Sequence, residues 1–239
     1  MKDSYSDHKV KNDVRHQLRG YPIISDQISR EALEVVCRQL ENTLQKDVPG
    51  GVVELGCYIG TTSLFIRRIL DAHTGHSESH GESAAREFHA YDSFEGLPEK
   101  SPQDANAAGI DFEAGKLYVS KKEFLQQFRT AKLMPPITHK GWFSELGPSD
   151  MPSQIAFAFL DGDFYQSIID SLRLVWPLLA DEGCIIIDDY KRETLPGVER
   201  AIRDFTQNKP VTIREEQNLA ILALATGDRT NDVRKGKRR

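Results

Sequence analysis

Three observations predict an α/β fold with a mostly parallel β-sheet. Segments with strand character alternate with segments of helical periodicity along most of the chain. Residues 155–160 and 184–187 are apolar at every position, which is typical of parallel strands covered on both faces. Several expected strands end at glycine or aspartate, and ligands of such sheets bind beside the carboxyl ends of the strands. A functional site is therefore expected at these strand ends.

The first expected elements are a helix, a strand and a second helix. Residues 29–46 carry apolar side chains at spacings of three and four, an amphipathic stripe that ends at Pro49. Residues 52–56 are typical of a short buried strand. Residues 61–72 begin with hydroxyl side chains, which are favoured at helix starts, and place their apolar residues on one face. Residues 73–87 form a polar loop whose histidines we expect to be solvated, although their spacing could also bind a metal ion.

The middle of the chain contains a weaker strand, a long connection and a helix. Residues 88–91 form the strand, which ends at Asp92. Residues 93–119 are rich in Gly, Pro, Asp and Asn, so we expect irregular structure; connections of this length are often functional. Residues 120–131 form the helix, whose first residue makes a capping box with Glu123.

Strands and helices alternate again in the second half. A helix is expected over residues 164–179, and Pro177 should end or kink it. The last two strands are expected to form an antiparallel pair. In chain order, the other elements expected here are strands over residues 137–140, 155–160 and 184–187, a helix over residues 197–205, and strands over residues 211–213 and 219–225.

Composition and charge exclude several classes of protein. The chain has 239 residues, of which 39% are hydrophobic, so it can bury a core and is not wholly disordered. Its net charge of −5 argues against a general nucleic-acid binder. No apolar run approaches the ~20 residues that span a bilayer. Because there is no signal-peptide pattern and the three cysteines form no CxxC motif, we expect a cytoplasmic protein with neither a nucleic-acid nor a membrane partner; a homo-oligomer is compatible with the sequence.

The polar ends of the chain suggest one domain with two extensions. Residues 1–19 form a polar N-terminal arm, and residues 20–226 form the single domain. The last 13 residues hold six basic and two acidic side chains and almost no apolar ones. We therefore expect residues 227–239 to be a basic, disordered tail.

The ends of the first three expected strands carry candidate ligand-binding residues. Gly56 and Gly60 let the backbone turn tightly into a helix, whose free N–H groups can bind an anion, although a plain structural turn has the same pattern and GxGxxG is absent. Asp92 is placed to hold a ribose diol, or it simply turns the chain. Trp142 could stack on a flat heterocycle or be a buried structural residue.

The next two strands each deliver carboxylates to the same edge of the sheet. Asp161 follows one strand, and Asp188 and Asp189 follow the other. Crowded carboxylates are unfavourable unless a cation compensates them, and Mg²⁺ prefers such ligands. Neighbours in an ideal strand point to opposite faces, so Asp188 and Asp189 can meet one ion only if their strand has ended. Asp163, with Gln166 three residues later, is expected to cap the following helix instead.

Taken together, these motifs resemble the macrocin O-methyltransferase (TylF/MycF) family. The resemblance extends from about residue 20 to residue 225 and rests on the motifs VVELGCYIGTTS, HAYDSFEGLP, HKGWFSELGP, FLDGDFYQSIIDSLRLVWPLL and GCIIIDDY, in that order. The first motif alone also resembles catechol O-methyltransferase. The resemblance implies a Rossmann-like, seven-stranded, mostly parallel methyltransferase sheet with helices on both faces. It also implies S-adenosylmethionine and Mg²⁺ as cofactors, with methylation of a sugar hydroxyl on a natural product.

The resemblance also implies a set of site residues. The methionine end of the cofactor, its ribose and its adenine would each meet the end of a different strand. Asp161 would be both a metal ligand and the general base. The implied cofactor residues are Glu54, Gly56, Tyr58, Gly60, Thr62 and Ser63 for the methionine end, Asp92 and Ser93 for the ribose, and Gly141, Trp142 and Phe143 for the adenine; the implied metal ligands are Asp161, Asp188 and Asp189.

Departures from the family pattern leave the acceptor open. Residues 73–87 look like an insertion, and residues 20–48, the N-terminal helical or lid region, are short and weakly patterned. A small-molecule acceptor is expected, either a sugar hydroxyl or a phenol or amine. A nicotinamide-dependent oxidoreductase and a non-catalytic binding protein are the alternatives of another class; the missing GxGxxG argues against the first, and the aspartates argue against the second.

Overall fold

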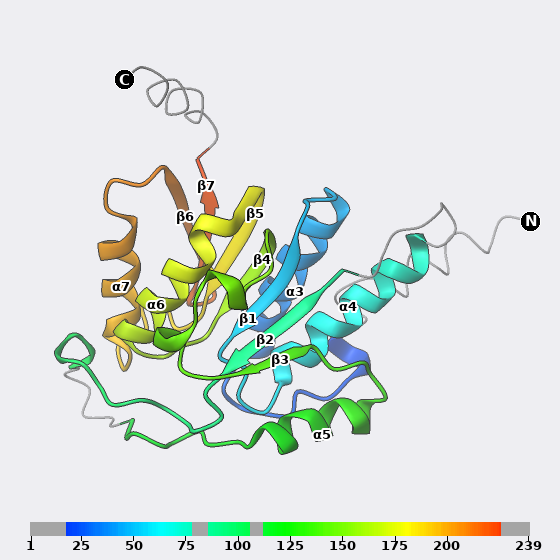
Figure 1. Ribbon diagram of the computed structural model, residues 1–239, viewed down its shortest axis with the longest axis horizontal. Helices are drawn as coiled ribbons and strands as arrows, with labels where there is room; N and C mark the ends of the chain where they lie inside the picture. The colour runs from blue at the N-terminus through cyan, green and yellow to red at the C-terminus, as the bar shows by residue number, and fades with distance from the viewer. Residues whose placement is uncertain (1–17, 78–85, 106–111, 226–239) are drawn as a thin grey trace, which may run out of the picture.

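A seven-stranded sheet forms the centre of the computed structural model, which describes residues 18–77, 86–105 and 112–225 (Figure 1). The strand order is β3-β2-β1-β4-β5-β7-β6. Only β7 runs antiparallel to its neighbours, so the predicted fold class is confirmed. The strands are β1 (Gly51–Leu55), β2 (Phe88–Asp92), β3 (Ile137–Lys140), β4 (Ile155–Leu160), β5 (Leu179–Ile187), β6 (Val211–Glu216) and β7 (Leu219–Leu224).

Helices cover both faces of the sheet (Figure 1). On one face, alternate strand residues such as Val52, Phe157 and Ile186 pack with α3 and α4. On the other face, the intervening residues such as Ala158 and Ile187 pack with α6 and α7. This division explains why β4 and β5 are apolar at every position. The helices are α3 (Arg30–Gln45), α4 (Thr61–Ser77), α5 (Lys121–Ala131), α6 (Tyr165–Val175) and α7 (Pro196–Thr206), with short 3₁₀ turns η2 (Pro102–Asp104), η3 (Phe143–Glu145), η4 (Pro148–Asp150) and η5 (Trp176–Leu178).

Most element boundaries lie within two residues of the prediction, and the exceptions have local causes. The α-helix α6 stops at Val175, and Pro177 lies in the 3₁₀ turn that follows, so the predicted effect of this proline is confirmed. β5 begins five residues early, at Leu179, because the buried Leu179 and Ala180 pack like strand residues. α4 continues to Ser77, into the segment expected to be a loop. Residues 78–85 of that segment lie outside the described part of the chain.

The N-terminal arm and the basic tail are almost entirely outside the described residues. From Leu18 onward the chain packs on the domain: Leu18 is buried, and its carbonyl accepts a hydrogen bond from Arg30. Further on, the centroid of the Tyr21 ring lies 3.9 Å from the Arg68 guanidinium of α4. In the described part of the chain, no helix is long and apolar enough to cross a membrane.

Two central strands, β1 and β4, approach each other closely where they end. The amide of Asp161 donates to the carbonyl of Leu55 at 2.8 Å, and the amide of Gly56 donates to the carbonyl of Tyr91 at 2.9 Å. Gly56 has φ +89°, and a Cβ added there would overlap the carbonyl oxygen of Asp161. The strand order reverses at β1, so this contact lies at the topological switch point, where ligands of such sheets bind.

The Gly56 contact predicts a specific stability loss. We expect Gly56→Ala to lower the free energy of unfolding by at least ~2 kcal/mol, because it combines positive-φ strain with backbone overlap. Gly115→Ala is the matched control, since Gly115 has φ +81° but nothing within 4 Å of an added Cβ. Gly115→Ala should lower the free energy of unfolding by about 1 kcal/mol. Urea unfolding measures both, and equal losses would contradict the role of the overlap.

Candidate active site

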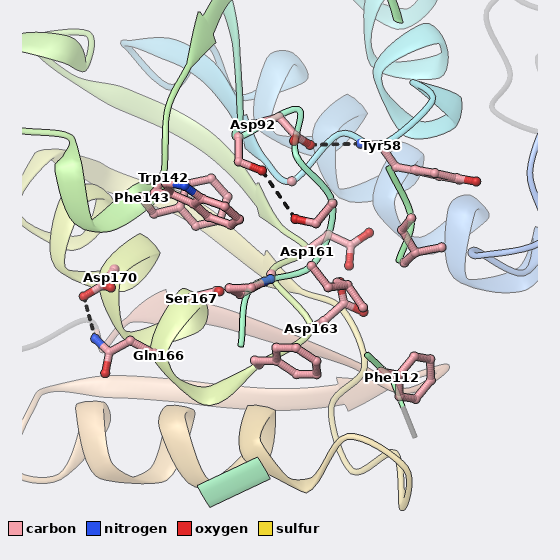
Figure 2. Close-up of a pocket in the computed structure, with 18 of the residues that line it drawn as sticks. Tyr58, Asp92, Phe112, Trp142, Phe143, Asp161, Asp163, Gln166, Ser167 and Asp170 are labelled. Carbon is pink, nitrogen blue, oxygen red and sulfur yellow. Dashed lines mark hydrogen bonds between the residues drawn. The ribbon is translucent and has the colours of Figure 1, made fainter. Parts of the chain in front are cut away.

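One pocket lies at the carboxyl ends of β1 to β5 (Figure 2). Every one of these strands contributes to it, together with α6 and the connection between β2 and α5. Seven of the eleven expected cofactor residues line it. The lining residues that follow strand ends are Gly56, Tyr58, Asp92, Ser93, Gly141, Trp142, Phe143, Asp161, Gly162, Asp163, Phe164 and Asp189.

The other four expected cofactor residues lie behind the β1 turn. Glu54 is buried and accepts a hydrogen bond from the Ser63 hydroxyl, and burial raises its pKa to about 8. Gly60 has φ +93°, and a Cβ added there would touch the Phe124 ring rather than the pocket. Thr62 is buried as well. These four residues therefore support the turn and do not line the pocket described here.

Asp92 joins the ends of β1 and β2. Its Oδ2 accepts from the amides of Cys57 and Tyr58 at 2.9 and 3.1 Å, and its Oδ1 accepts from the amide of Phe94 at 2.7 Å (Figure 2). A carboxylate has about four lone-pair sites. The Cys57 thiol also donates to Oδ2, at 3.6 Å, so Oδ1 alone keeps room for about one further donor, fewer than the two that a ribose diol presents.

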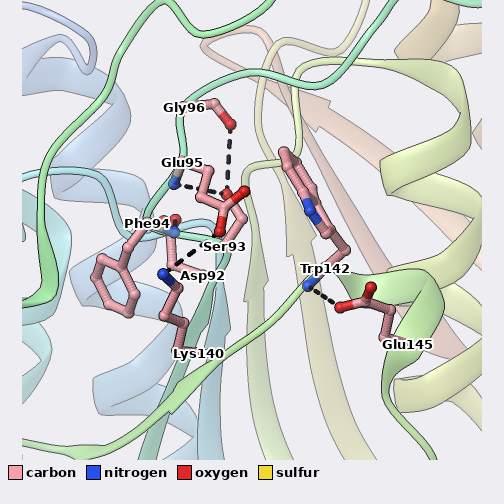
Figure 3. Close-up of polar contacts among 8 residues, drawn as sticks. All are labelled: Asp92, Ser93, Phe94, Glu95, Gly96, Lys140, Trp142 and Glu145. Carbon is pink, nitrogen blue, oxygen red and sulfur yellow. Dashed lines mark hydrogen bonds and ion pairs between the residues drawn. The ribbon is translucent and has the colours of Figure 1, made fainter.

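Side-chain contacts also hold the loops after β2 and β3 (Figure 3). The Ser93 hydroxyl accepts from the amide of Glu95 at 3.1 Å and donates to the Gly96 carbonyl at 3.4 Å. The Glu95 carboxylate forms an ion pair with Lys140 across the two strand ends. The amide of Trp142 donates to Glu145 at 3.2 Å. These contacts fix the backbone on either side of the pocket wall.

An aromatic wall follows β3. Trp142 and Phe143 are both half-buried, and Figure 2 shows them side by side near Ser167. A purely structural tryptophan would be covered, whereas this one lines the pocket. The wall is available for stacking on a flat heterocycle.

Three carboxylates meet where β4 and β5 end. Asp161, Asp163 and Asp189 place oxygen atoms within 4.8 Å of one another. Asp163 and Asp189 have φ +58° and +56°, a left-handed conformation that is uncommon outside glycine and often found at functional sites. Asp188 is not one of these three, but it lies close to them: its Oδ1 accepts from the amide of Asp189 at 2.8 Å, and its charge raises the pKa of Asp161. The two expected strand ends therefore do converge, and Asp163 joins the acids that we expected there.

The expectation that Asp163 caps α6 is wrong. The N-cap residue is Phe164, which has no side-chain capping hydrogen bond. The first helical amide, that of Tyr165, instead donates to Oδ1 of Asp104 at 2.7 Å. Capping by a residue 61 positions away leaves no local sequence signal, whereas the Asp-Gly-Asp spacing did offer a signal for a second acid in the cluster.

Burial and, after it, the charges of neighbouring acids raise the pKa values in and beside this acidic cluster. Burial raises the pKa of Asp163 to about 8, with the Asp189 charge as the next cause. Burial and then the Asp188 charge raise the pKa of Asp161 well above its usual range. The pKa of Asp188, again mainly through burial, is raised to about 7. In the absence of a cation, folding therefore opposes the ionisation of these acids.

Acidic side chains outnumber basic ones in the pocket lining. Among its described lining residues, Arg192 is the one cationic side chain, and its guanidinium donates to Oδ1 of Asp189 at 2.6 Å. This contact leaves the second oxygen of Asp189 for another partner. One guanidinium cannot balance six carboxylates. The acidic lining residues are Asp92, Glu99, Asp161, Asp163, Asp170 and Asp189.

Sequence reasoning missed several lining residues. Gln27 comes from the segment before α3, and Leu97 and Phe112 come from the long connection after β2. Gln166 and Asp170 come from the first turns of α6, where they hydrogen bond to each other at 2.9 Å (Figure 2). Gln166 and Asp170 could have been predicted, because they are polar residues in the first turns of a helix that follows a strand with ligand-binding residues at its end. Nothing in the sequence around Gln27 indicates that it lines the pocket.

Comparison with known proteins agrees with this geometry. The profile of the macrocin O-methyltransferase (TylF) family matches residues 2–217. The chain belongs to the TylF family. It is similar to 8-demethyl-8-(2,3-dimethoxy-alpha-L-rhamnosyl)-tetracenomycin-C 4'-O-methyltransferase of Streptomyces olivaceus, with 35% identity over 70% of this chain and 61% of that relative's length. It is also similar to demethyldecarbamoylnovobiocin O-methyltransferase of Streptomyces niveus, with 28% identity over 78% of this chain and 71% of the relative.

A solved structure supports the fold assignment of this TylF-family chain. The structure of the O-methyltransferase NovP superimposes with a TM-score of 0.67 and covers 91% of this chain and 88% of that one. Sequence identity is 23%, so the likeness concerns the fold.

The acidic cluster predicts a pH-dependent stability. In the protein without added cations, we expect Asp163→Asn to stabilise more at pH 8 than at pH 5, by on the order of 1 kcal/mol. The raised pKa of about 8 means that folding opposes ionisation, so the penalty grows as pH rises from about 4 to about 8, and asparagine removes it. Thermal unfolding at both pH values measures the effect. Asp170→Asn, in the same pocket but outside the cluster, is the control, and equal effects of the two variants would contradict the interpretation.

Proposed function

We propose that this chain is an S-adenosylmethionine- and Mg²⁺-dependent O-methyltransferase that acts on a hydroxyl of a sugar or a glycosylated natural product. The observation that carries the proposal is the convergence of Asp161, Asp163 and Asp189 in the pocket that Trp142 also lines. Membership of the TylF family and the names of its relatives support it.

The pocket's charge supports a cationic methyl donor. S-adenosylmethionine supplies an activated methyl group on a positively charged sulfur, which an acidic pocket attracts. The β1 turn at Gly56 and Tyr58 would hold the methionine end, Asp92 one ribose hydroxyl, and Trp142 the adenine. A nicotinamide dinucleotide fits less well, because its pyrophosphate would meet six carboxylates and one guanidinium. The charge therefore favours methyl transfer over hydride transfer.

The chemistry of the acidic cluster supports a magnesium site. Asp161, Asp163 and one oxygen of Asp189 would hold the ion, since Mg²⁺ binds carboxylate oxygens and keeps several waters. When bound, Mg²⁺ lowers the pKa of an acceptor hydroxyl and fixes its orientation. Asp163 thereby replaces Asp188 among the ligands that we expected from the sequence.

Asp161 is proposed as the general base. A carboxylate oxygen of Asp161 would accept the proton of the acceptor hydroxyl as the methyl group passes to the acceptor oxygen and the donor leaves as the neutral thioether. The backbone of Asp161 is held by the hydrogen bond to Leu55, so the side chain starts from a fixed position. Alignment by such rigid groups is what a pre-activated methyl donor requires.

The acceptor side of the pocket supports a partly apolar substrate. Leu97, Phe112, Leu117 and Phe164 line the pocket beyond the acids. Two of the relatives carry names that describe O-methylation of a rhamnosyl-tetracenomycin and of demethyldecarbamoylnovobiocin. In such a substrate, a sugar hydroxyl would meet the acidic side chains and an apolar aglycone would meet these four apolar side chains. A phenol or amine acceptor is the alternative outcome of an acceptor screen.

The proposed base and metal predict a separation of binding from chemistry. We expect Asp161→Ala to lower kcat by at least ~100-fold while S-adenosylmethionine binds within about threefold of wild type, because Asp161 acts on the acceptor proton. Calorimetry with the donor and a mass-spectrometric acceptor screen measure the two effects. EDTA should stop wild-type turnover; undiminished activity in EDTA would refute the metal's role.

The identity of the third ligand predicts a difference between two neighbouring acids. We expect Asp163→Asn to weaken Mg²⁺ binding by roughly tenfold or more. Asp188→Asn should weaken it less, because asparagine keeps the Oδ1 acceptor for the amide of Asp189. Calorimetric titration of Mg²⁺ into both variants measures the contrast. A larger loss in Asp188→Asn would restore Asp188 as the ligand and remove Asp163.

A further inference from the structure

The helix that begins beside the acidic cluster has no cap from its own sequence. α6 starts at Tyr165, two residues after Asp163, and its N-cap Phe164 offers no side-chain acceptor. Ser, Thr, Asp or Asn normally fills this position, because the first N–H groups of a helix lack intrahelical partners. Asp163 is adjacent and chemically suited, yet its carboxylate faces Asp161 and Asp189. Another group must therefore satisfy the start of α6.

Asp104, in the 3₁₀ turn η2, supplies this missing acceptor. Its Oδ1 accepts from the amide of Tyr165 at 2.7 Å. Its Oδ2 accepts from the amide of Ser101 at 2.9 Å and from the Ser101 hydroxyl at 2.5 Å. The residue is 3% exposed, so these bonds are shielded from water. A buried carboxylate with three donors at a helix N-terminus is electrostatically stabilised there.

The start of α7 leaves space for the Asp104 carboxylate. Gly197, in the first turn of α7, lies against the carboxylate, and a Cβ at that position would overlap Oδ1 of Asp104 and come within 2.9 Å of the amide of Tyr165. The Arg200 guanidinium donates to the carbonyl of Gln103, the neighbour of Asp104. The turn η2 is thus held by the N-terminal turns of both α6 and α7.

We propose that Asp104 is a positioning residue: by capping α6 from a distant loop, it leaves Asp163 to join the acidic cluster and holds that cluster's α6 side in place. The effect of Asp104 on catalysis rests on the proposed function, whereas its capping of α6 does not depend on that function. Without Asp104, the amide of Tyr165 needs a new acceptor, and Asp163 is the nearest suitable residue in the chain. Turning Asp163 toward the helix would remove one of the three carboxylates from the cluster.

Substitution of Asp104 tests the proposal directly. We expect Asp104→Ala to speed amide hydrogen exchange at residues 164–168. It should weaken Mg²⁺ binding by about fivefold, which is the change in affinity that corresponds to the free energy of one lost helix cap. It should also lower kcat more than it raises KM for the acceptor. Asp104→Asn keeps an oxygen for Tyr165 and should recover most of the magnesium affinity. The amides at the start of α5, which Ser120 caps, serve as the internal reference for exchange.

Asp150 provides a matched control. Like Asp104, it closes a 3₁₀ turn, with its Oδ2 accepting from the amide of Gly147 at 2.8 Å. Asp150 is exposed, however, and among the described residues it forms no hydrogen bond or ion pair with α6. Asp150→Ala should leave the magnesium affinity and the exchange of residues 164–168 unchanged. If the two alanine variants lower magnesium affinity equally, the effect of Asp104 is one of general stability and the positioning role is overturned.

Gly197 gives a second, independent perturbation. Alanine is the better helix former, so Gly197→Ala should favour α7 locally while its methyl group displaces the Asp104 carboxylate. We expect it to reproduce the exchange and magnesium effects of Asp104→Ala. In the double variant the carboxylate is gone, so the two effects should not add. Additive effects would overturn the proposed shared contact.

The same measurements distinguish failure of this inference from failure of the proposed function. If wild-type protein binds no Mg²⁺, the proposed metal site fails, and hydrogen exchange at residues 164–168 still decides whether Asp104 caps α6. If wild-type protein binds Mg²⁺ and Asp104→Ala binds it equally well, the positioning role is overturned while the metal site stands. Unchanged exchange at residues 164–168 in Asp104→Ala overturns the capping itself.

Discussion

Mutual repulsion among Asp161, Asp163 and Asp189 is the constraint to which the rest of the site responds. Their oxygens lie within 4.8 Å of one another. Burial raises the pKa values of all three, and the charges of neighbouring acids raise those of Asp161 and Asp163 further. Such an arrangement survives only if the surrounding fold holds it rigidly. The fold does so by ending β4 and β5 side by side and by placing two of the acids in left-handed backbone conformations.

The contacts around the pocket form a continuous support for these acids. Gly56 allows β1 to approach the backbone of Asp161, Asp92 ties the β1 turn to the end of β2, and Asp104 holds the start of α6. Each contact joins segments far apart in the chain through backbone groups. Because backbone positions move little compared with side chains, this support defines where a methyl donor and its acceptor could meet. Family membership and pocket charge agree with that use of the site.

The positions where sequence reasoning failed are informative for the same reason. Asp163 and Gln166 have the spacing of a capping box, yet the cap is Asp104 and Gln166 binds Asp170. Local patterns describe the helix start correctly, but they cannot reveal that a distant loop has taken over the cap. The motif VVELGCYIGTTS likewise did not predict that Glu54 and Ser63 hydrogen bond to each other behind the β1 turn and support it.

The sequence alone determined the order of strands and helices, the family, and the strand ends at which the site lies, because periodicity, turn residues and motif order are properties of neighbouring positions. Only the tertiary structure decided which carboxylates face one another, how many hydrogen bonds Asp92 can still accept, and that Gln27 reaches the pocket. Those outcomes depend on strand adjacency and backbone dihedrals at the ends of β4 and β5. No spacing along the chain encodes the direction in which a side chain points once its strand has ended.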